Sequence, residues 1–175
     1  SFFGSKFGRF VEEILVSPVS NQVILMGYIT GGLARAFAVA IIVTVLSLFF
    51  THLPIHNIFA VVSITILTAV LFSTLGFINA VYAKGFDDVS IVPTFVLTPL
   101  TYLGGVFFSI DLLPDFWAGV AQLNPILYVV NAFRYGILGV SDISLGWAYV
   151  ILDSMTIVAY LIAVRLLANG AGVRS

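Results

Sequence analysis

The sequence predicts an all-α membrane protein that crosses the bilayer several times. Of its 175 residues, 61% are hydrophobic and only 9% are charged, whereas soluble domains carry about 25% charged residues. A soluble core of this size could not bury so much apolar surface, so lipid is the expected solvent for most of the chain. The net charge of −1 argues against nucleic acid as a partner. There is no cysteine, which excludes disulfides, thiolate metal sites and a cysteine nucleophile.

Four apolar segments are long enough to cross a bilayer, which takes roughly 20 helical residues. A polar hinge around Lys84 separates the second segment from the third, and a long mixed segment separates the third from the fourth. Pro93 and Pro99 predict a kink in the third segment. We therefore expect one transmembrane domain over residues 1–175, with spans at 28–50, 58–82, 90–108 and 145–167 and the mixed segment at 109–144.

The basic residues predict the orientation. Lys6 and Arg9 precede the first predicted span, Lys84 follows the second, and Arg165 and Arg174 end the fourth. An even number of spans places all five on one side, and the positive side is the cytoplasm. Both ends of the chain are therefore expected in the cytoplasm. The first residues show no charged region followed by an apolar core and a cleavage site, so we expect no signal peptide.

The mixed segment 109–144 is apolar enough to enter lipid but is interrupted at Pro114, Pro125 and Gly136. The piece from Pro125 to Tyr135 is too short to cross, and apolar runs of 10–14 residues are typical of re-entrant or interfacial helices. Two interpretations follow. The segment is either a hairpin lying flat on the outer face, or a partly inserted pair of helices that closes an outer exit.

Residues 4–17 predict a short amphipathic helix. Its apolar side chains recur at i, i+3, i+4, i+7 and i+8 and so form one face. They are Phe7, Phe10, Val11, Ile14 and Leu15. The other face carries Arg9, Glu12 and Glu13. Ser17-Pro18 ends the helix, because the residue before a proline avoids the α region, and Ser20 can cap the next helix.

The two glutamates on this helix are unexpected at a membrane surface. A helix on the inner leaflet normally carries Lys and Arg, because that surface is negative. The polar face with Glu12 and Glu13 is therefore expected to contact a protein partner. The alternative is a solvated face without a partner.

Two stretches of the chain resemble the ABC type-2 export permeases. RFVEEILVSPVSNQVILMGYITGGLARA resembles the cytoplasmic coupling segment of that family. The stretch from Phe86 to Gly139 resembles a later part, in which a glycine-rich span exit precedes a re-entrant pair. Its markers here are Leu113-Pro114, Asn124-Pro125 and Arg134. The resemblance favours the inserted interpretation of residues 109–144. It also implies that the chain is the C-terminal part of a six-span permease.

The resemblance implies a function as well. Such permeases work in the bacterial inner membrane as two membrane halves, here two copies of the chain, above two ATPase subunits that bind ATP and Mg. The coupling helix would contact the ATPase through Arg9, Glu12, Glu13, Ile14, Leu15, Ser17 and Pro18. The re-entrant pair would form an outer gate with Leu113, Pro114, Asn124, Pro125 and Arg134.

The chain itself shows no catalytic constellation. It lacks the G-x-x-x-x-G-K-[ST] loop that cradles ATP phosphates. We therefore expect no enzymatic activity and no cofactor in this chain alone. A metal site at His52 and His56 is not expected, because no third ligand is in view. A secondary transporter, a channel subunit or a membrane scaffold remain as alternatives, but none of them needs a coupling helix.

Three charged residues stand apart from these motifs. Arg35 lies inside the first span and either extends to the inner headgroups or lines a substrate path. Asp153 lies inside the fourth span and either forms a structural hydrogen bond, which we favour, or lines a path. Arg134 is expected to pair with an outer aspartate such as Asp111 or Asp115.

Overall fold

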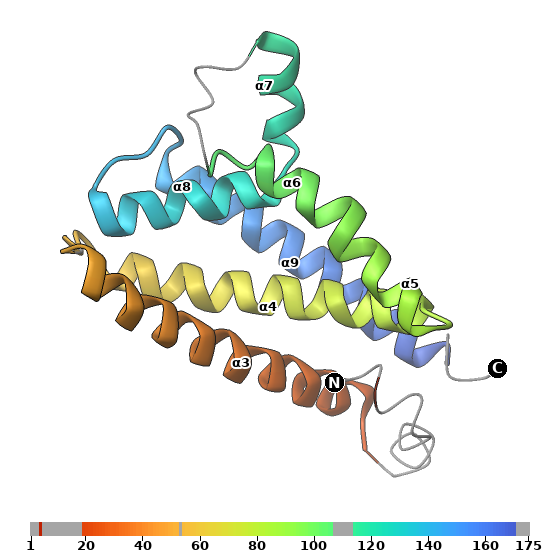
Figure 1. Cartoon of the computed structure of the whole chain (residues 1–175). Helices are drawn as coiled ribbons and strands as arrows, with labels where there is room; N and C mark the ends of the chain where they lie inside the picture. The colour runs from red at the N-terminus through yellow and green to blue at the C-terminus, as the bar shows by residue number, and fades with distance from the viewer. Residues whose placement is uncertain (1–3, 5–18, 53, 107–113, 171–175) are drawn as a thin grey trace.

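The computed structural model describes residues 4, 19–52, 54–106 and 114–170, and the structural statements below concern these residues. They form helices, with no strand among them, which confirms the predicted all-α class. The amphipathic helix predicted at 4–17 lies outside the described residues apart from Gly4. With the labels of Figure 1, the elements are α3 (Asn21–Phe50), α4 (Ile58–Tyr82), α5 (Phe86–Ile91), the π-helix η1 (Val92–Leu97), α6 (Thr98–Tyr102), α7 (Asp115–Gln122), α8 (Pro125–Leu138) and α9 (Leu145–Ala168).

Three of these helices, α3, α4 and α9, are long and apolar enough to cross a membrane. α4 and α9 begin and end within one residue of the second and fourth predicted spans. α3 begins at Asn21, seven residues earlier than the predicted 28, and its first two turns already bury Ile24 and Leu25. Ser20 occupies the N-cap position without a side-chain cap. Its carbonyl accepts hydrogen bonds from the amides of Val23 and Ile24.

The third predicted span, 90–108, is displaced and interrupted. The helical residues run through α5, η1 and α6, from 86 to 102. The helix begins early because the Asp88 carboxylate accepts hydrogen bonds from the amides of Lys84 and Gly85, at 2.9 and 3.2 Å. In η1, the amide of Thr98 donates to the carbonyl of Pro93, which is the i→i+5 pattern of a π-helix. Of the two prolines predicted to kink this span, Pro93 lies within this widened turn and Pro99 lies in the α-helix α6 directly after it.

α4 is the central helix of the bundle, and α3, α8 and α9 pack around it (Figure 1). One buried cluster joins α3, α4 and α9 and includes Leu25, Phe77 and Ala163. A second joins α4, α8 and α9 and includes Ile64 and Leu152. The start of α3 and the ends of α4 and α9 lie at one end of the bundle, with the hinge around Lys84. The loop 51–57 lies at the opposite end.

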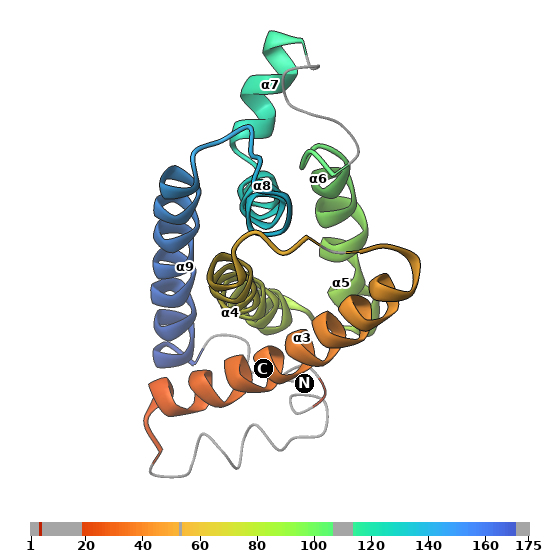
Figure 2. The ribbon, with the colours of Figure 1, turned by 90° about the vertical axis from the view of Figure 1, so that its left-hand side faces the viewer.

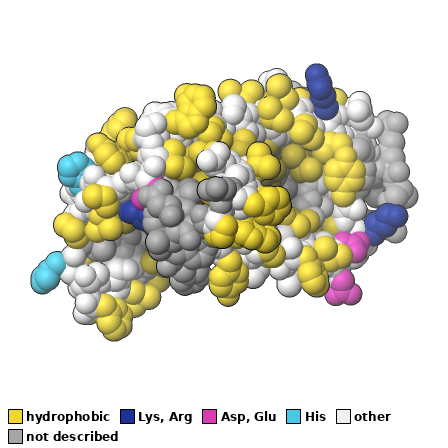
Figure 3. Space-filling model, turned by 90° about the horizontal axis from the view of Figure 1, so that it is seen from above, with side chains coloured by type: hydrophobic (Ala, Val, Ile, Leu, Met, Phe, Trp, Pro, Cys, Tyr) yellow, Lys and Arg dark blue, Asp and Glu magenta, His cyan; other side chains and the backbone are white. Residues whose placement is uncertain are grey.

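The surface fits this arrangement. Figure 3 shows acidic and basic side chains mainly toward one end of the molecule and the two histidines at the other, with hydrophobic side chains between. The exposed apolar side chains include most of the second half of α3, such as Ile41, Leu48 and Phe49. A surface of this kind is expected for a protein whose solvent is lipid.

The segment between α6 and α9 contains two helices with different surroundings. α8 lies along α4 and α9, and its residues Tyr128, Val129 and Ala132 belong to the second buried cluster. α7 projects away from the bundle, and among the described helices it packs mainly against α8 (Figures 1 and 2). Of these two helices, α8 is therefore part of the helical bundle.

Candidate functional site: the α8 helix and the groove beside it

The start of α8 is tied to α6 by Asn124. Its side-chain oxygen caps the helix by accepting a hydrogen bond from the Ile126 amide at 3.0 Å. Its side-chain amide donates to the Leu100 carbonyl at 2.5 Å. Pro125 occupies the first helical position, where the missing amide costs nothing. Asn124 is only 1% exposed, so both of its hydrogen bonds are needed at this buried position.

The middle of α8 holds a second buried asparagine, Asn131. Its amide donates to the Leu127 carbonyl at 3.0 Å. Its oxygen accepts from the Asp142 amide at 3.0 Å and from the Ser141 hydroxyl at 3.3 Å. Asn131 therefore binds the loop that leads from α8 into α9. Sequence reasoning did not single it out, because the pattern offered only a polar residue within an apolar helix.

Arg134 connects three parts of the chain. Its guanidinium forms an ion pair with Asp142 at 3.0 Å and donates to the Gly105 carbonyl at 2.9 Å. In the described part of the chain, the expectation of an aspartate partner is met by Asp142. The left-handed Gly139, at φ 76°, ends α8 and turns the chain back, so that Asp142 comes within reach. Asp111 lies outside the described residues, as does the side chain of Asp115.

The end of α8 is bound to the loop before α4. The amide of Asn57 donates to the Gly136 carbonyl at 2.8 Å, and the amide of His56 donates to the Ile137 carbonyl at 3.2 Å. The predicted interruption at Gly136 is wrong, since α8 runs through it to Leu138. Gly136 instead allows a close approach, because a Cβ there would lie 2.7 Å from Val61 Cγ2.

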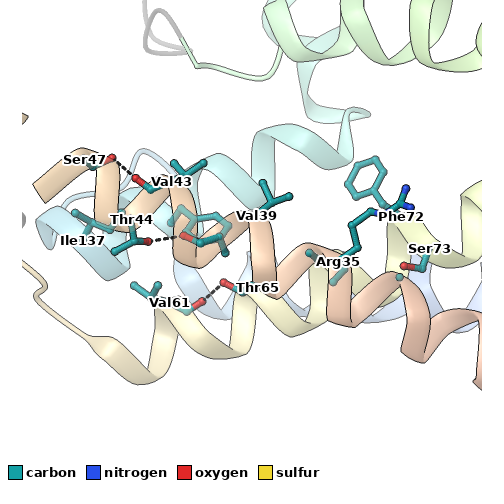
Figure 4. Close-up of a pocket in the computed structure, with 15 residues that line it drawn as sticks. Arg35, Val39, Val43, Thr44, Ser47, Val61, Thr65, Phe72, Ser73 and Ile137 are labelled. Carbon is teal, nitrogen blue, oxygen red and sulfur yellow. Dashed lines mark hydrogen bonds between the residues drawn. The ribbon is translucent and has the colours of Figure 1, made fainter. Parts of the chain in front are cut away.

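A groove of about 760 Å³ opens between α3, α4 and α8. Figure 4 shows its wall, in which Arg35 is the only charged side chain among the described lining residues. We call it the Arg35 groove. Its lining residues are Gly32, Arg35, Ala36, Val39, Ala40, Val43, Thr44 and Ser47 of α3, Val61, Thr65, Ala69, Phe72 and Ser73 of α4, and Phe133 and Ile137 of α8.

The structure does not bring Arg35 and Asp153 together. Arg35 lines the groove on α3, while Asp153 is exposed on α9. Among the described residues, neither side chain has a hydrogen bond or an ion pair. The structural hydrogen bond favoured for Asp153 is therefore not found in this part of the chain. The neighbouring hydroxyls of Ser154 and Thr156 donate to carbonyls of their own helix.

The other predicted site residues divide into two groups. Pro114 is exposed and precedes α7 as its N-cap residue, next to the undescribed Leu113. The predicted ATPase-coupling residues lie outside the described residues, so their role stays a prediction. They are Arg9, Glu12, Glu13, Ile14, Leu15, Ser17 and Pro18. In the described part of the chain, no group of three His, Cys, Asp or Glu side chains could hold a metal ion.

Comparison with known proteins decides the family. The model of the ABC-2 type transporter family matches residues 1–138. The chain belongs to the ABC-2 type transporter family. It is 53% identical over 175 residues to the inner membrane transport permease YadH of Escherichia coli (strain K12), a match that covers 100% of this chain and 68% of YadH. YadH of Shigella flexneri gives the same identity and coverage.

A more distant relative matches only part of this ABC-2 type transporter. Nodulation protein J of Rhizobium leguminosarum bv. viciae is 29% identical over 73 residues, which are 42% of this chain and 28% of that protein. No solved structure matches the chain.

Proposed function

We propose that this chain is the membrane-spanning permease subunit of an ATP-driven exporter of the bacterial inner membrane. In this proposal it works as a homodimer with a separate ATPase subunit, and the ATPase binds ATP and Mg. The observation that carries it is the match along all 175 residues to an inner membrane transport permease. The three apolar helices that are long enough to cross a membrane support it.

The proposal places the end of the bundle that holds Lys84 in the cytoplasm. Arg165, in the last turn of α9, lies at the same end. This distribution of basic residues follows the positive-inside rule. The predicted coupling helix at 4–17 immediately precedes α3, which begins at this end. A motion of the ATPase would therefore reach α3 directly.

In this proposal α8 forms part of the outer gate. It packs on the half of α4 that lies next to loop 51–57, away from the Lys84 end. Its start is hydrogen-bonded to α6 through Asn124, and its end to residues 56 and 57. A movement of α6 would be passed along α8 to the outer loop through these bonds. During such a movement, the ion pair of Arg134 with Asp142 would keep the turn before α9 attached to α8.

Reconstitution with the ATPase tests the proposal. The candidate ATPase is the product of a neighbouring reading frame with a phosphate-binding loop, and the measurement is ATP hydrolysis in proteoliposomes with and without this chain. We expect the chain to stimulate hydrolysis, and we expect Glu13→Lys to abolish the stimulation. Hydrolysis that the chain leaves unchanged, together with no effect of Glu13→Lys, would refute the coupling.

A matched control separates the coupling from a general charge effect. Asp87 is an exposed acidic residue of α5 at the same end of the bundle. Asp87→Asn and Glu13→Gln each remove one negative charge. We expect only Glu13→Gln to lower the stimulated rate. Equal losses in both variants would show that net charge, and not the coupling helix, determines the rate.

A further inference from the structure

The Arg35 groove exists because α3 leaves α4 after a single close approach. At Gly32 a Cβ would lie 2.8 Å from Ser73 Cβ, so the two backbones meet there. The buried residues of α3 are Ile24, Leu25 and Ile29, which all precede this crossing. Beyond it α3 diverges from α4, as Figure 2 shows. The second half of α3 therefore leaves an open wedge that α8 closes on only one side.

The wall of the groove is suited to a hydrocarbon chain. Most of its surface comes from Val, Ala, Ile and Phe side chains. Three of its four hydroxyls donate to carbonyls of their own helix: Thr44 to Ala40, Ser47 to Val43, and Thr65 to Val61, at 2.7 to 2.8 Å. The fourth hydroxyl belongs to Ser73. A sugar would meet few free donors here. The volume of about 760 Å³ lies within the ~300–1,000 Å³ of small-molecule sites.

Arg35 gives the groove one charged end. In Figure 4 its side chain points away from Ser47, toward the start of α3, which lies at the Lys84 end of the bundle in Figure 1. Helical side chains lean toward the helix N-terminus, so this direction is the natural one for α3. The described residues of the lining include no Asp or Glu, and no described residue neutralises the guanidinium. A charge in this position requires an anion or the headgroup region.

The length of the groove fits an acyl chain. α3 has 30 residues and is about 45 Å long, more than the ~30 Å of a bilayer hydrocarbon core. Part of α3 therefore extends beyond the hydrocarbon. Arg35 lies near the middle of the helix, and the stretch from Arg35 to Ser47 is about 18 Å long at 1.5 Å per residue. An acyl chain can follow this stretch while its headgroup remains on the Lys84 side.

We propose that the Arg35 groove binds an anionic phospholipid of the bilayer, with its phosphate at the Arg35 guanidinium and an acyl chain along Val39, Val43 and Ile137. Guanidinium binds phosphate through two parallel hydrogen bonds. A zwitterionic lipid is disfavoured in comparison, because no described lining residue offers a carboxylate to its ammonium group. The inference rests on the proposed membrane location but requires neither an ATPase nor export.

Spin-labelled lipids test the proposal on the full chain in phosphatidylcholine vesicles. The measurement is the immobilised fraction of labelled phosphatidylglycerol compared with labelled phosphatidylcholine. We expect a preference for phosphatidylglycerol of up to about fivefold, the ratio for one exposed ion pair. Arg35→Gln should bring the ratio close to one, while Arg35→Lys should retain part of it. Equal immobilisation of both lipids by the unmodified chain would overturn the proposal.

Two further variants test whether the lipid preference arises in the groove. Arg165→Gln removes an exposed positive charge on α9, outside the groove, and should leave the preference intact. Ala40→Phe fills the groove without changing charge and should lower immobilisation of both lipids. A preference that Arg165→Gln abolishes as completely as Arg35→Gln would assign it to overall charge and overturn the site.

Another outcome would identify a protein occupant. A cysteine introduced as Val43→Cys can be reacted with a maleimide in the same vesicles. Protection of this cysteine without any lipid preference would mean that a helix covers the groove, and the proposal would fail. The test measures binding only, so it stands even if the chain does not stimulate an ATPase. Failure of lipid binding would in turn leave the ATPase experiment intact.

Discussion

Arg134 of α8 and Asp142, in the turn before α9, form an ion pair at 3.0 Å. The same guanidinium donates to the Gly105 carbonyl at 2.9 Å. Both charged side chains are about three quarters covered, at 24% and 23% exposure. One side chain therefore joins the end of the α6 segment, α8 and the start of α9.

We expect Arg134 to matter more than its partner. Arg134→Met removes the ion pair and leaves the Gly105 carbonyl unsatisfied, which should cost about 1–3 kcal/mol. Asp142→Asn retains a polar side chain and should cost less than about 1 kcal/mol. The free energy of unfolding by SDS in mixed micelles measures both. Equal losses in the two variants would show that the bond to Gly105 contributes nothing.

Gly136 should not tolerate a methyl group. A Cβ there would lie 2.7 Å from Val61 Cγ2 and 3.2 Å from the Val61 backbone nitrogen. Gly136→Ala should therefore push α8 from α4 and cost about 1–3 kcal/mol. Gly76→Ala is the control, since no atom lies within 4 Å of a Cβ at that helical position. It should be neutral or stabilise by up to about 1 kcal/mol, as measured by the same unfolding experiment.

The crossing of α3 and α4 predicts a rescue. Gly32→Ala should destabilise the protein, because the new Cβ meets Ser73. Ser73→Gly removes that obstacle, so the double variant should recover about 1 kcal/mol or more of the loss. Gly31→Ala, with no atom within 4 Å of its Cβ, should show no such coupling. A double-mutant cycle measures the coupling energy, and additive effects of Gly32→Ala and Ser73→Gly would contradict the close approach.

Asp153 should contribute little to the stability of a single copy. It is exposed on α9, and no described residue forms a hydrogen bond or an ion pair with it. Asp153→Asn should therefore change the free energy of unfolding by no more than about 0.5 kcal/mol. A loss well above 1 kcal/mol would reveal a partner in the rest of the chain. Transport assays on the same variant then report a role in the path separately from folding.

Much of the framework followed from the sequence. Hydropathy and length located α4 and α9 within one residue, because a membrane helix is defined by local composition and by the thickness of the bilayer. The dipeptide Asn124-Pro125 marked the start of α8, because a cap and a proline act on the backbone next to them. The two stretches that resemble the coupling segment and the re-entrant pair of the ABC type-2 permeases also indicated the family.

Other features depended on residues far apart in the chain. The partner of Arg134 was Asp142 because Gly139 reverses the chain, and composition could not choose among the outer aspartates. The interruption expected at Gly136 became a contact between α8 and α4. The third predicted span shifted because a carboxylate in the hinge begins the helix and a π-turn accommodates Pro93.

The sequence by itself determined that this protein is a helical membrane protein of the ABC-2 type transporter family. Only the tertiary structure decided that α3 meets α4 at Gly32 and then diverges, so that Arg35 lies in an open apolar groove. The physical reason is the distance along the chain over which each kind of interaction acts. Helix formation and lipid solubility depend on neighbours along the chain, whereas the contact of two helices depends on the shapes of both surfaces where they cross.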